Sequence, residues 1–205
     1  MKGKYNTIIL LILIGLILSI FINIKHNNER ENDYGIFLNH SFHLLDSTSN
    51  NIGGIINSVQ KDEYDHLDHT FIMTSKYFFE LERLLNDGRY FIDSGLDMNE
   101  FWGFDFIAEV LLGSANLNGT YYYGHHFLED GIVSDKELEF LIELHGDLEV
   151  LLSKLANEDG NNANENISIE EFKGAIMNFF EKWGFENANG YVEGGESPFN
   201  TLLKN

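Results

Sequence analysis

Residues 7–24 read TIILLILIGLILSIFINI, eighteen residues without a charged side chain. At about 1.5 Å per residue this run makes about 27 Å of helix, close to the hydrocarbon thickness of a bilayer, which is about 30 Å. A cleaved signal peptide would need small residues before its cleavage site, whereas residues 19–24 are bulky almost throughout. We therefore expect a retained transmembrane anchor over residues 7–24.

The charges on the two sides of this run differ only slightly, and this difference sets the expected orientation. Two lysines precede the run, and Lys25 and Arg30 follow it together with two glutamates. The positive-inside rule slightly favours a cytoplasmic N-terminus, and a short N-terminal tail of residues 1–6 fits a signal anchor. We therefore expect a single-pass protein of the cell membrane, with the large domain outside the cytoplasm.

The charge balance restricts the partners of that domain. The net charge is −20, and residues 31–205 hold nine basic against 32 acidic side chains. Such a surface repels phosphate backbones, so we expect no nucleic acid among the partners. It suits solubility, cations or a basic protein partner. The chain has no cysteine, which excludes disulfides, thiolate metal sites and cysteine catalysis.

Two stripes of core-type residues follow the polar stretch 25–33, which we interpret as a juxtamembrane linker. In both stripes the residues recur at alternating steps of four and three, the period of an amphipathic helix. The first stripe consists of Tyr34, Leu38, Ser41, Leu45, Thr48, Ile52, Ile55 and Val59. The second consists of Tyr64, Leu67, Phe71, Thr74, Phe78, Leu81 and Leu85. We expect an antiparallel helical hairpin over residues 34–93, with its first helix weakened or interrupted at Gly53-Gly54.

The remaining chain predicts a compact helical subdomain over residues 94–184, with two polar loops, and a flexible tail over residues 185–205. A third helix is expected after a capping pattern at residues 97–100, followed by an irregular loop over residues 113–133. Two further helices are expected to open at Ser134-x-x-Glu137 and Ser168-x-x-Glu171, the first of them broken at residues 145–147. The expected fold class is therefore all-α.

Those two helix starts share a longer pattern. Residues 130–138 read DGIVSDKEL and residues 164–172 read NENISIEEF. Both contain the same pattern: a hydrophobic residue, then Ser, then two variable residues, then Glu and an apolar residue. The pattern resembles the second half of an EF-hand loop, occurring twice at about the spacing of an EF-hand pair. The family binds calcium through oxygens at loop positions 1, 3, 5, 7 and 12, the last a bidentate glutamate.

The resemblance implies two loops, over residues 126–137 and 160–171. The side chains that would match ligand positions are those of Asp130, Ser134, Glu137, Asn162, Asn164, Ser168 and Glu171. The first loop departs from the family in having His126 and Leu128 at positions 1 and 3, and the second has Gly160 at position 1. So few charged ligands imply weak affinity, of about 10⁻⁴–10⁻³ M, which is usable outside the cell.

A simpler interpretation competes with calcium binding. Both Ser-x-x-Glu patterns are complete capping boxes, which start helices without a metal, and we favour this alternative. The pairs His40-x-x-His43 and His66-x-x-His69 have a spacing that suits metal ligation on a helix. The core stripes place all four histidines on solvent-facing sides, so we expect no metal there.

No motif of catalysis or of cofactor binding is present: the sequence lacks G-x-S-x-G, H-E-x-x-H, a P-loop and G-x-G-x-x-G. We therefore expect no catalytic residue, no cofactor-binding residue and no enzyme. The leading hypothesis is a membrane-anchored acidic binding or sensing domain, with weak calcium binding as an option. The alternative is an acidic inhibitor or immunity-type factor that binds a basic partner. The aromatic segment 121–126 contacts a ligand or covers the core, and the sequence leaves both open.

Overall fold

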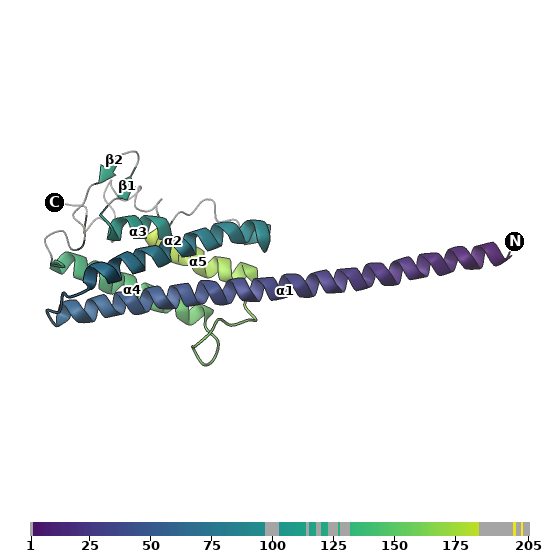
Figure 1. Cartoon of the computed structure of the whole chain (residues 1–205), viewed down its shortest axis with the longest axis horizontal. Coiled ribbons are helices and arrows are strands. Elements are labelled where there is room, and N and C mark those ends of the chain that lie inside the picture. Colours follow the sequence, from purple (N-terminus) through teal and green to yellow (C-terminus); the bar gives the residue numbers. More distant parts are fainter. Residues whose placement is uncertain are drawn as a thin grey trace.

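A computed structural model of the chain describes residues 2–96, 103–113, 115–117, 120–122, 127, 132–184, 199 and 202 (Figure 1). Residues 2–12, 95, 115–117 and 120–122 are described in their backbone only. The helices and strands, in chain order, are α1 (Lys2–Gln60), α2 (Leu67–Phe91), the 3₁₀ turn η1 (Ser94–Leu96), α3 (Phe104–Leu111), β1 (Ala115–Leu117), β2 (Thr120–Tyr122), α4 (Asp135–Leu155) and α5 (Ile169–Trp183).

Helix α1 is a single helix of 59 residues whose first half projects from the body, while its second half lies in a helical bundle (Figure 1). The expected segments 7–24 and 25–33 fall in this helix, as do residues 2–6 of the expected N-terminal tail, and no break in the described backbone marks their boundaries. The expected interruption at Gly53-Gly54 does not occur. Gly53 lies against α4, where a Cβ would come within 2.9 Å of the Nε2 atom of His145, so the missing side chain lets the two helices approach.

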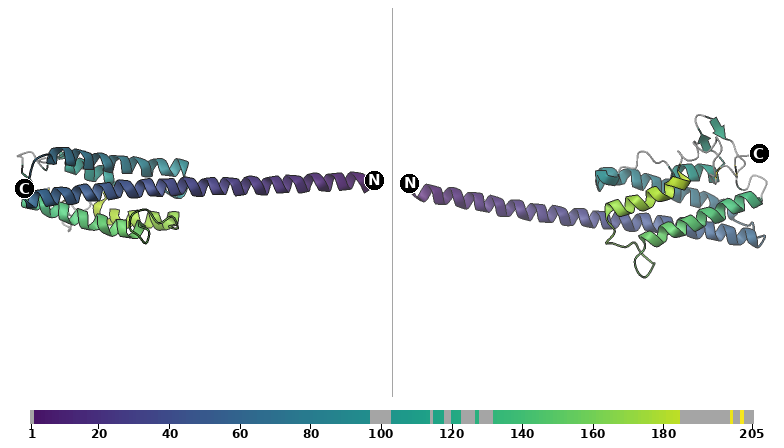
Figure 2. Two further views of the ribbon diagram at one scale, coloured as in Figure 1. Left: turned by 60° about the horizontal axis from the view of Figure 1, so that its bottom comes forward. Right: turned by 180° about the vertical axis from the view of Figure 1, so that it is seen from behind.

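The bundle is built on the second half of α1. Helices α2 and α4 pack on α1, α3 packs on α2, and α5 packs on α4, with α4 and α5 running antiparallel (Figures 1 and 2). The two predicted stripes face the core, since every member is buried except Tyr34 and Tyr64, which are partly buried against it. The all-α prediction is confirmed by this architecture, because the core is formed by helices.

Aromatic rings fill the centre of the bundle. Phe104 of α3 is fully buried and lies between Phe78 of α2 and the rings of Phe179 and Phe180 of α5, with centroid distances of 4.7–5.7 Å. Trp183 at the end of α5 is also fully buried, and its indole N–H donates to Asp147 Oδ2 on α4 at 2.8 Å. These contacts join α5 to the other helices of the bundle.

The membrane anchor is not supported by the structure. In the part of the chain whose side chains are described, no helix is long and apolar enough to cross a membrane. Residues 7–12 of the expected anchor lie outside that part.

Two local expectations were wrong. Residues 113–133 were expected to be irregular, yet β1 and β2 pair as an antiparallel hairpin in which Asn116 lies opposite Tyr121. Helix α4 was expected to break at residues 145–147, yet it runs unbroken from Asp135 to Leu155. The capping pattern at residues 97–100 lies outside the described residues, and α3 begins at Phe104 with Gly103 as its N-cap.

Candidate functional site: the polar loop between α4 and α5

The polar loop that joins α4 to α5 is closed by backbone hydrogen bonds. An isolated antiparallel bridge pairs Ala156 with Ala163. Next to it, the Asn164 N–H donates to the Leu155 carbonyl and the Asn157 N–H donates to the Asn162 carbonyl, both at 2.8 Å. Gly160 turns the chain at a φ of +73°, a conformation that L-residues rarely adopt. The loop is therefore a defined hairpin-like turn.

Two apolar side chains fasten this loop to the bundle, and one asparagine shapes its exit. Ala163 and Ile167 are buried, with exposed fractions of 2% and 8%. The Asn164 side-chain oxygen accepts the N–H of Asn166 at 3.0 Å, a turn that leads the chain toward α5. Of the residues matched to calcium ligands, Asn162 and Ser168 are exposed and Asn164 is half-buried.

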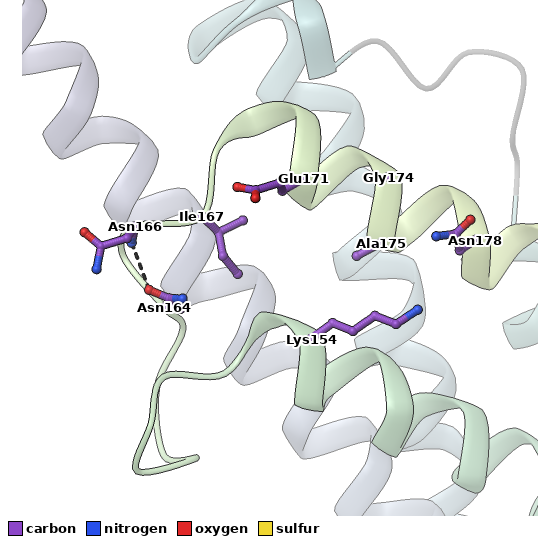
Figure 3. A pocket seen from close by; sticks show the side chains of 8 residues that line it. All are labelled: Lys154, Asn164, Asn166, Ile167, Glu171, Gly174, Ala175 and Asn178. Atoms are coloured by element: carbon purple, nitrogen blue, oxygen red, sulfur yellow. Dashed lines mark hydrogen bonds between the residues drawn. The ribbon is translucent and has the colours of Figure 1, made fainter.

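A cavity of about 500 Å³ lies between this loop and the two helices that it joins. Its lining residues are Lys154, Asn164, Asn166, Ile167, Glu171, Gly174, Ala175 and Asn178 (Figure 3). Lys154 comes from the end of α4, and its side chain runs alongside α5, below Ala175 in this view (Figure 3). The lining offers one cation, one carboxylate and three amides, and it suits a polar ligand better than an apolar one.

Both Ser-x-x-Glu patterns form capping boxes. At α4, the Ser134 N–H donates to Glu137 Oε2 at 2.6 Å, and the Glu137 N–H donates to Ser134 Oγ at 3.4 Å. At α5, the Ser168 N–H donates to Glu171 Oε2 at 2.9 Å, and the Glu171 N–H donates to Ser168 Oγ at 3.2 Å. The hydrogen bonds from the Ser168 backbone and hydroxyl lower the pKa of Glu171. Each glutamate therefore already has a structural role at a helix start.

The described end of the first predicted calcium loop, at Ser134, does not lie beside the loop that follows α4. Helix α4 contains 21 residues, which is about 31 Å of helix, and it separates the Ser134 cap from the loop after Leu155. In an EF-hand pair, the aliphatic residues at Val133 and Ile167 would form the bridge between loops. The bridge that the structure contains pairs Ala156 with Ala163, both on the C-terminal side of α4. Asp130 and His126 lie outside the described residues.

The histidine pairs lie where the helical stripes predicted. His40 and His43 on α1 are exposed, as are His66 and His69 at the start of α2. Throughout the part of the chain that the structure describes, no three His, Asp or Glu side chains are grouped so that they could hold a metal ion.

One buried charge was missed by the sequence interpretation. Glu82 on α2 is 5% exposed, and its Oε2 accepts the N–H of Phe104 at the start of α3, at 3.1 Å. Burial, and then the nearby charge of Asp105, raises the pKa of Glu82 to about 7. Burial, and then the charge of Glu109, raises the pKa of Asp105 to about 6. The available signal was the place of Glu82 beside Leu81 and Phe78 on the core stripe.

Comparison with known proteins adds no relative: no family model, no curated protein and no solved structure matches this chain. By its fold, the described chain is a helical bundle that carries one two-stranded hairpin and a long N-terminal helical extension.

Proposed function

We propose that this chain is a membrane-tethered, non-enzymatic binding or sensing domain, which holds an acidic helical bundle outside the cytoplasmic membrane. The observation that carries the proposal is the exposure of the apolar side chains on the projecting half of α1. We call residues 13–24, which belong to this projecting half, the arm. Its exposed apolar residues are Leu13, Ile14, Leu16, Ile17, Leu18, Ile20, Phe21, Ile22 and Ile24, with exposed fractions from 46% to 68%.

The distribution of these side chains around the helix favours lipid over a protein partner. At 3.6 residues per turn, nearly consecutive apolar positions point in every direction from the axis. A coiled-coil partner would cover one stripe of such a helix and leave the rest in water. A bilayer covers the whole circumference, and the uncharged run of residues 7–24 in the sequence has the length of a span.

The unbroken course of α1 supports a sensing or display role. The same helix that carries Phe21 in the arm carries Leu38 and Leu45 in the core of the bundle, both fully buried. A shift or rotation of the arm is therefore transmitted to the bundle through continuous helix rather than through a flexible linker. In return, a ligand on the bundle acts on the arm.

The acidic surface supports the second candidate, an interaction factor for a basic partner. Helix α4 presents Glu139, Glu143 and Glu149 to solvent, in a chain whose net charge is −20. Complementary charge raises association rates and is screened by salt. Capture of a basic protein by the full chain at low salt, and its release at moderate salt, would favour this candidate. Capture that is insensitive to salt would count against it.

The sidedness of the bundle can be tested with a single cysteine, because the chain has none. Ile142 on α4 is 47% exposed, so an Ile142→Cys variant places one accessible thiol on the bundle. In intact cells, a membrane-impermeant maleimide is expected to label this thiol. Labelling only after permeabilisation would place the bundle in the cytoplasm and contradict this part of the proposal. Calcium is not part of the proposed function, and weak calcium binding stays a prediction.

A further inference from the structure

The last turn of α2 exposes two aromatic side chains at the end of the bundle from which the arm leaves. Phe91 is 79% exposed and Tyr90 is 70% exposed, the highest values among the large apolar side chains that the structure describes. Such exposure at the tip of an otherwise amphipathic helix leaves apolar surface available to another phase or molecule.

An ion pair fixes the position of this tip along α1. Arg30 of α1 binds Asp93, two residues after the end of α2. Arg30 follows the last residue of the arm, Ile24, by six positions, which is about 9 Å of helix. Figures 1 and 2 show the end of α2 beside α1 at the point where α1 leaves the bundle. A membrane around the arm would therefore have the outer edge of its headgroup layer near the level of the Arg30–Asp93 pair, close to Tyr90 and Phe91.

The chemistry of the tip matches that layer. Each headgroup layer is about 5–8 Å thick, and tyrosine is enriched there because its ring is apolar and its hydroxyl is polar. Arg89 holds its guanidinium 4.4 Å from the centroid of the Tyr90 ring and donates from Nη2 to the Tyr90 hydroxyl at 2.5 Å. The aliphatic part of an arginine tolerates an apolar surface while its head reaches phosphate or water.

We propose that the last turn of α2 is a second membrane contact, at which Tyr90 and Phe91 rest in the lipid headgroup layer. This inference rests on the proposed membrane tether and deepens it. Two contacts, the arm and the α2 tip, fix the tilt of the bundle on the bilayer, which a single helix does not.

The local charges make this contact independent of anionic lipid. Lys25 pairs with Glu29 at 3.7 Å and Arg30 pairs with Asp93, so these two basic side chains of α1 have acidic partners. The bundle as a whole is acidic and is repelled by anionic headgroups. The contact therefore depends on burial of the aromatic rings, and zwitterionic phosphatidylcholine is a sufficient partner.

The test uses the absence of native cysteine. Three single-cysteine variants of the full chain, Phe21→Cys, Tyr90→Cys and Ile72→Cys, are labelled with an environment-sensitive fluorophore and placed in phosphatidylcholine nanodiscs. Ile72 is the matched control, because it is 57% exposed on the same helix and lies about 27 Å from position 90. Lipid with a nitroxide on its headgroup is expected to quench the label at 90 and to leave the label at 72 unchanged. Nitroxide on the acyl chain is expected to quench the label at 21.

The three labels separate the failure of this inference from the failure of the tether. Quenching at 21 without quenching at 90 would overturn the α2 contact and leave the tether in place. No quenching at 21 would overturn the tether itself. A label at 90 that is shielded from both nitroxide lipid and aqueous iodide would show that protein, such as a second copy of the chain, covers the tip, and would also overturn the α2 contact.

A charge placed in the contact gives an independent test. In the Tyr90→Cys chain, a further Phe91→Glu substitution is expected to abolish quenching at 90, because a carboxylate resists transfer from water into the layer. The matched substitution Ile72→Glu is expected to leave quenching at 90 unchanged. Equal quenching in both variants would contradict a contact that depends on Phe91.

Discussion

At the scale of single residues, Glu82 is a carboxylate in the core that accepts a backbone N–H at the start of α3. Its pKa is raised from 4.5 to about 7, so the folded state binds the proton more tightly than the unfolded state does. The corresponding stability is fully present below about pH 4.5 and is lost as the pH rises through about 7.

The Glu82→Gln variant is expected to remove this pH dependence. Glutamine keeps an oxygen for the Phe104 N–H but carries no charge, so the variant should exceed the native chain in unfolding free energy at pH 8. By linkage the gain is at most about 3 kcal/mol, and it should vanish near pH 4.5. Denaturant unfolding across this range measures it. The matched control is Glu80→Gln on the exposed side of α2. Native and Glu82→Gln stabilities that stay parallel from pH 4.5 to 8 would contradict the assignment.

Two glycines are expected to respond in opposite ways to the same substitution. A Cβ on Gly103 would lie 2.2 Å from the ring of Phe180, whereas a Cβ on Gly54 in α1 would meet no atom within 4 Å. Gly103→Ala should therefore destabilise the bundle by about 1–3 kcal/mol through overpacking. Gly54→Ala should stabilise it by up to about 1 kcal/mol through helix propensity. Thermal unfolding of both variants checks the pair, and a Gly103→Ala chain as stable as the native one would refute the packing at Phe180.

Residue identities predicted the core well but not its polar exceptions. The helical period of the apolar residues placed Leu38, Leu45 and Phe78 in the interior, where they are buried. This prediction succeeded because the tendency of an apolar side chain to be buried depends on its own type and not on a particular partner. Glu82 needs a partner, the start of α3, that lies 22 positions away in the chain. The core stripe indicates that Glu82 is buried, but no local pattern identifies this partner.

At the scale of elements, the two capping boxes show that the positions of the atoms are needed to choose between two interpretations of one sequence motif. The Ser-x-x-Glu spacing follows from the N-cap and N3 positions of a helix, and both boxes form as such a spacing predicts. The calcium interpretation needed two loops side by side. The unbroken course of α4 past Gly146 places the Ser134 cap and the loop after Leu155 at opposite ends of one helix, and the sequence did not show this.

The Ser168→Ala variant separates capping from calcium binding. Loss of the hydroxyl acceptor for the Glu171 N–H is expected to lower the unfolding free energy by about 1 kcal/mol. A structural cap does not depend on a metal, so the loss should be equal in chelator and in millimolar calcium. The Ser153→Ala variant is the control, since that exposed hydroxyl donates to the Val150 carbonyl within α4 and belongs to neither cap. A loss that appears only with calcium would assign Ser168 to a metal site instead.

The sequence also failed to predict that β1 pairs with β2 and that α1 and α4 are continuous. The residues Asn118-Gly119 between β1 and β2 are a known hairpin signal, which was outweighed by the aromatic and glycine-rich composition of residues 113–133. The glycines at 53 and 146 were expected to weaken or break helices. They lie inside α1 and α4, because packing in a long helix offsets a propensity cost of about 1 kcal/mol.

At the scale of the whole molecule, the arrangement joins an exposed apolar arm and an acidic bundle through one continuous helix (Figure 1). The first half of α1 adds little to the core, since the described side chains from Leu13 to Arg30 are exposed. An arm of this kind is costly in water and is stabilised in a bilayer, which is why we propose a tether. The acidic bundle then remains free for a ligand or partner.

Extraction of membranes at alkaline pH tests the tether most directly. The full chain is expected to stay in the membrane pellet, and a chain with Ile17→Arg and Phe21→Arg is expected to move to the supernatant, because each arginine costs about 2.5–3.5 kcal/mol at the centre of a span. A control chain with Ile72→Arg and Ile142→Arg, two exposed positions on the bundle, is expected to stay in the pellet. Recovery of the unaltered chain in the supernatant would contradict the central claim.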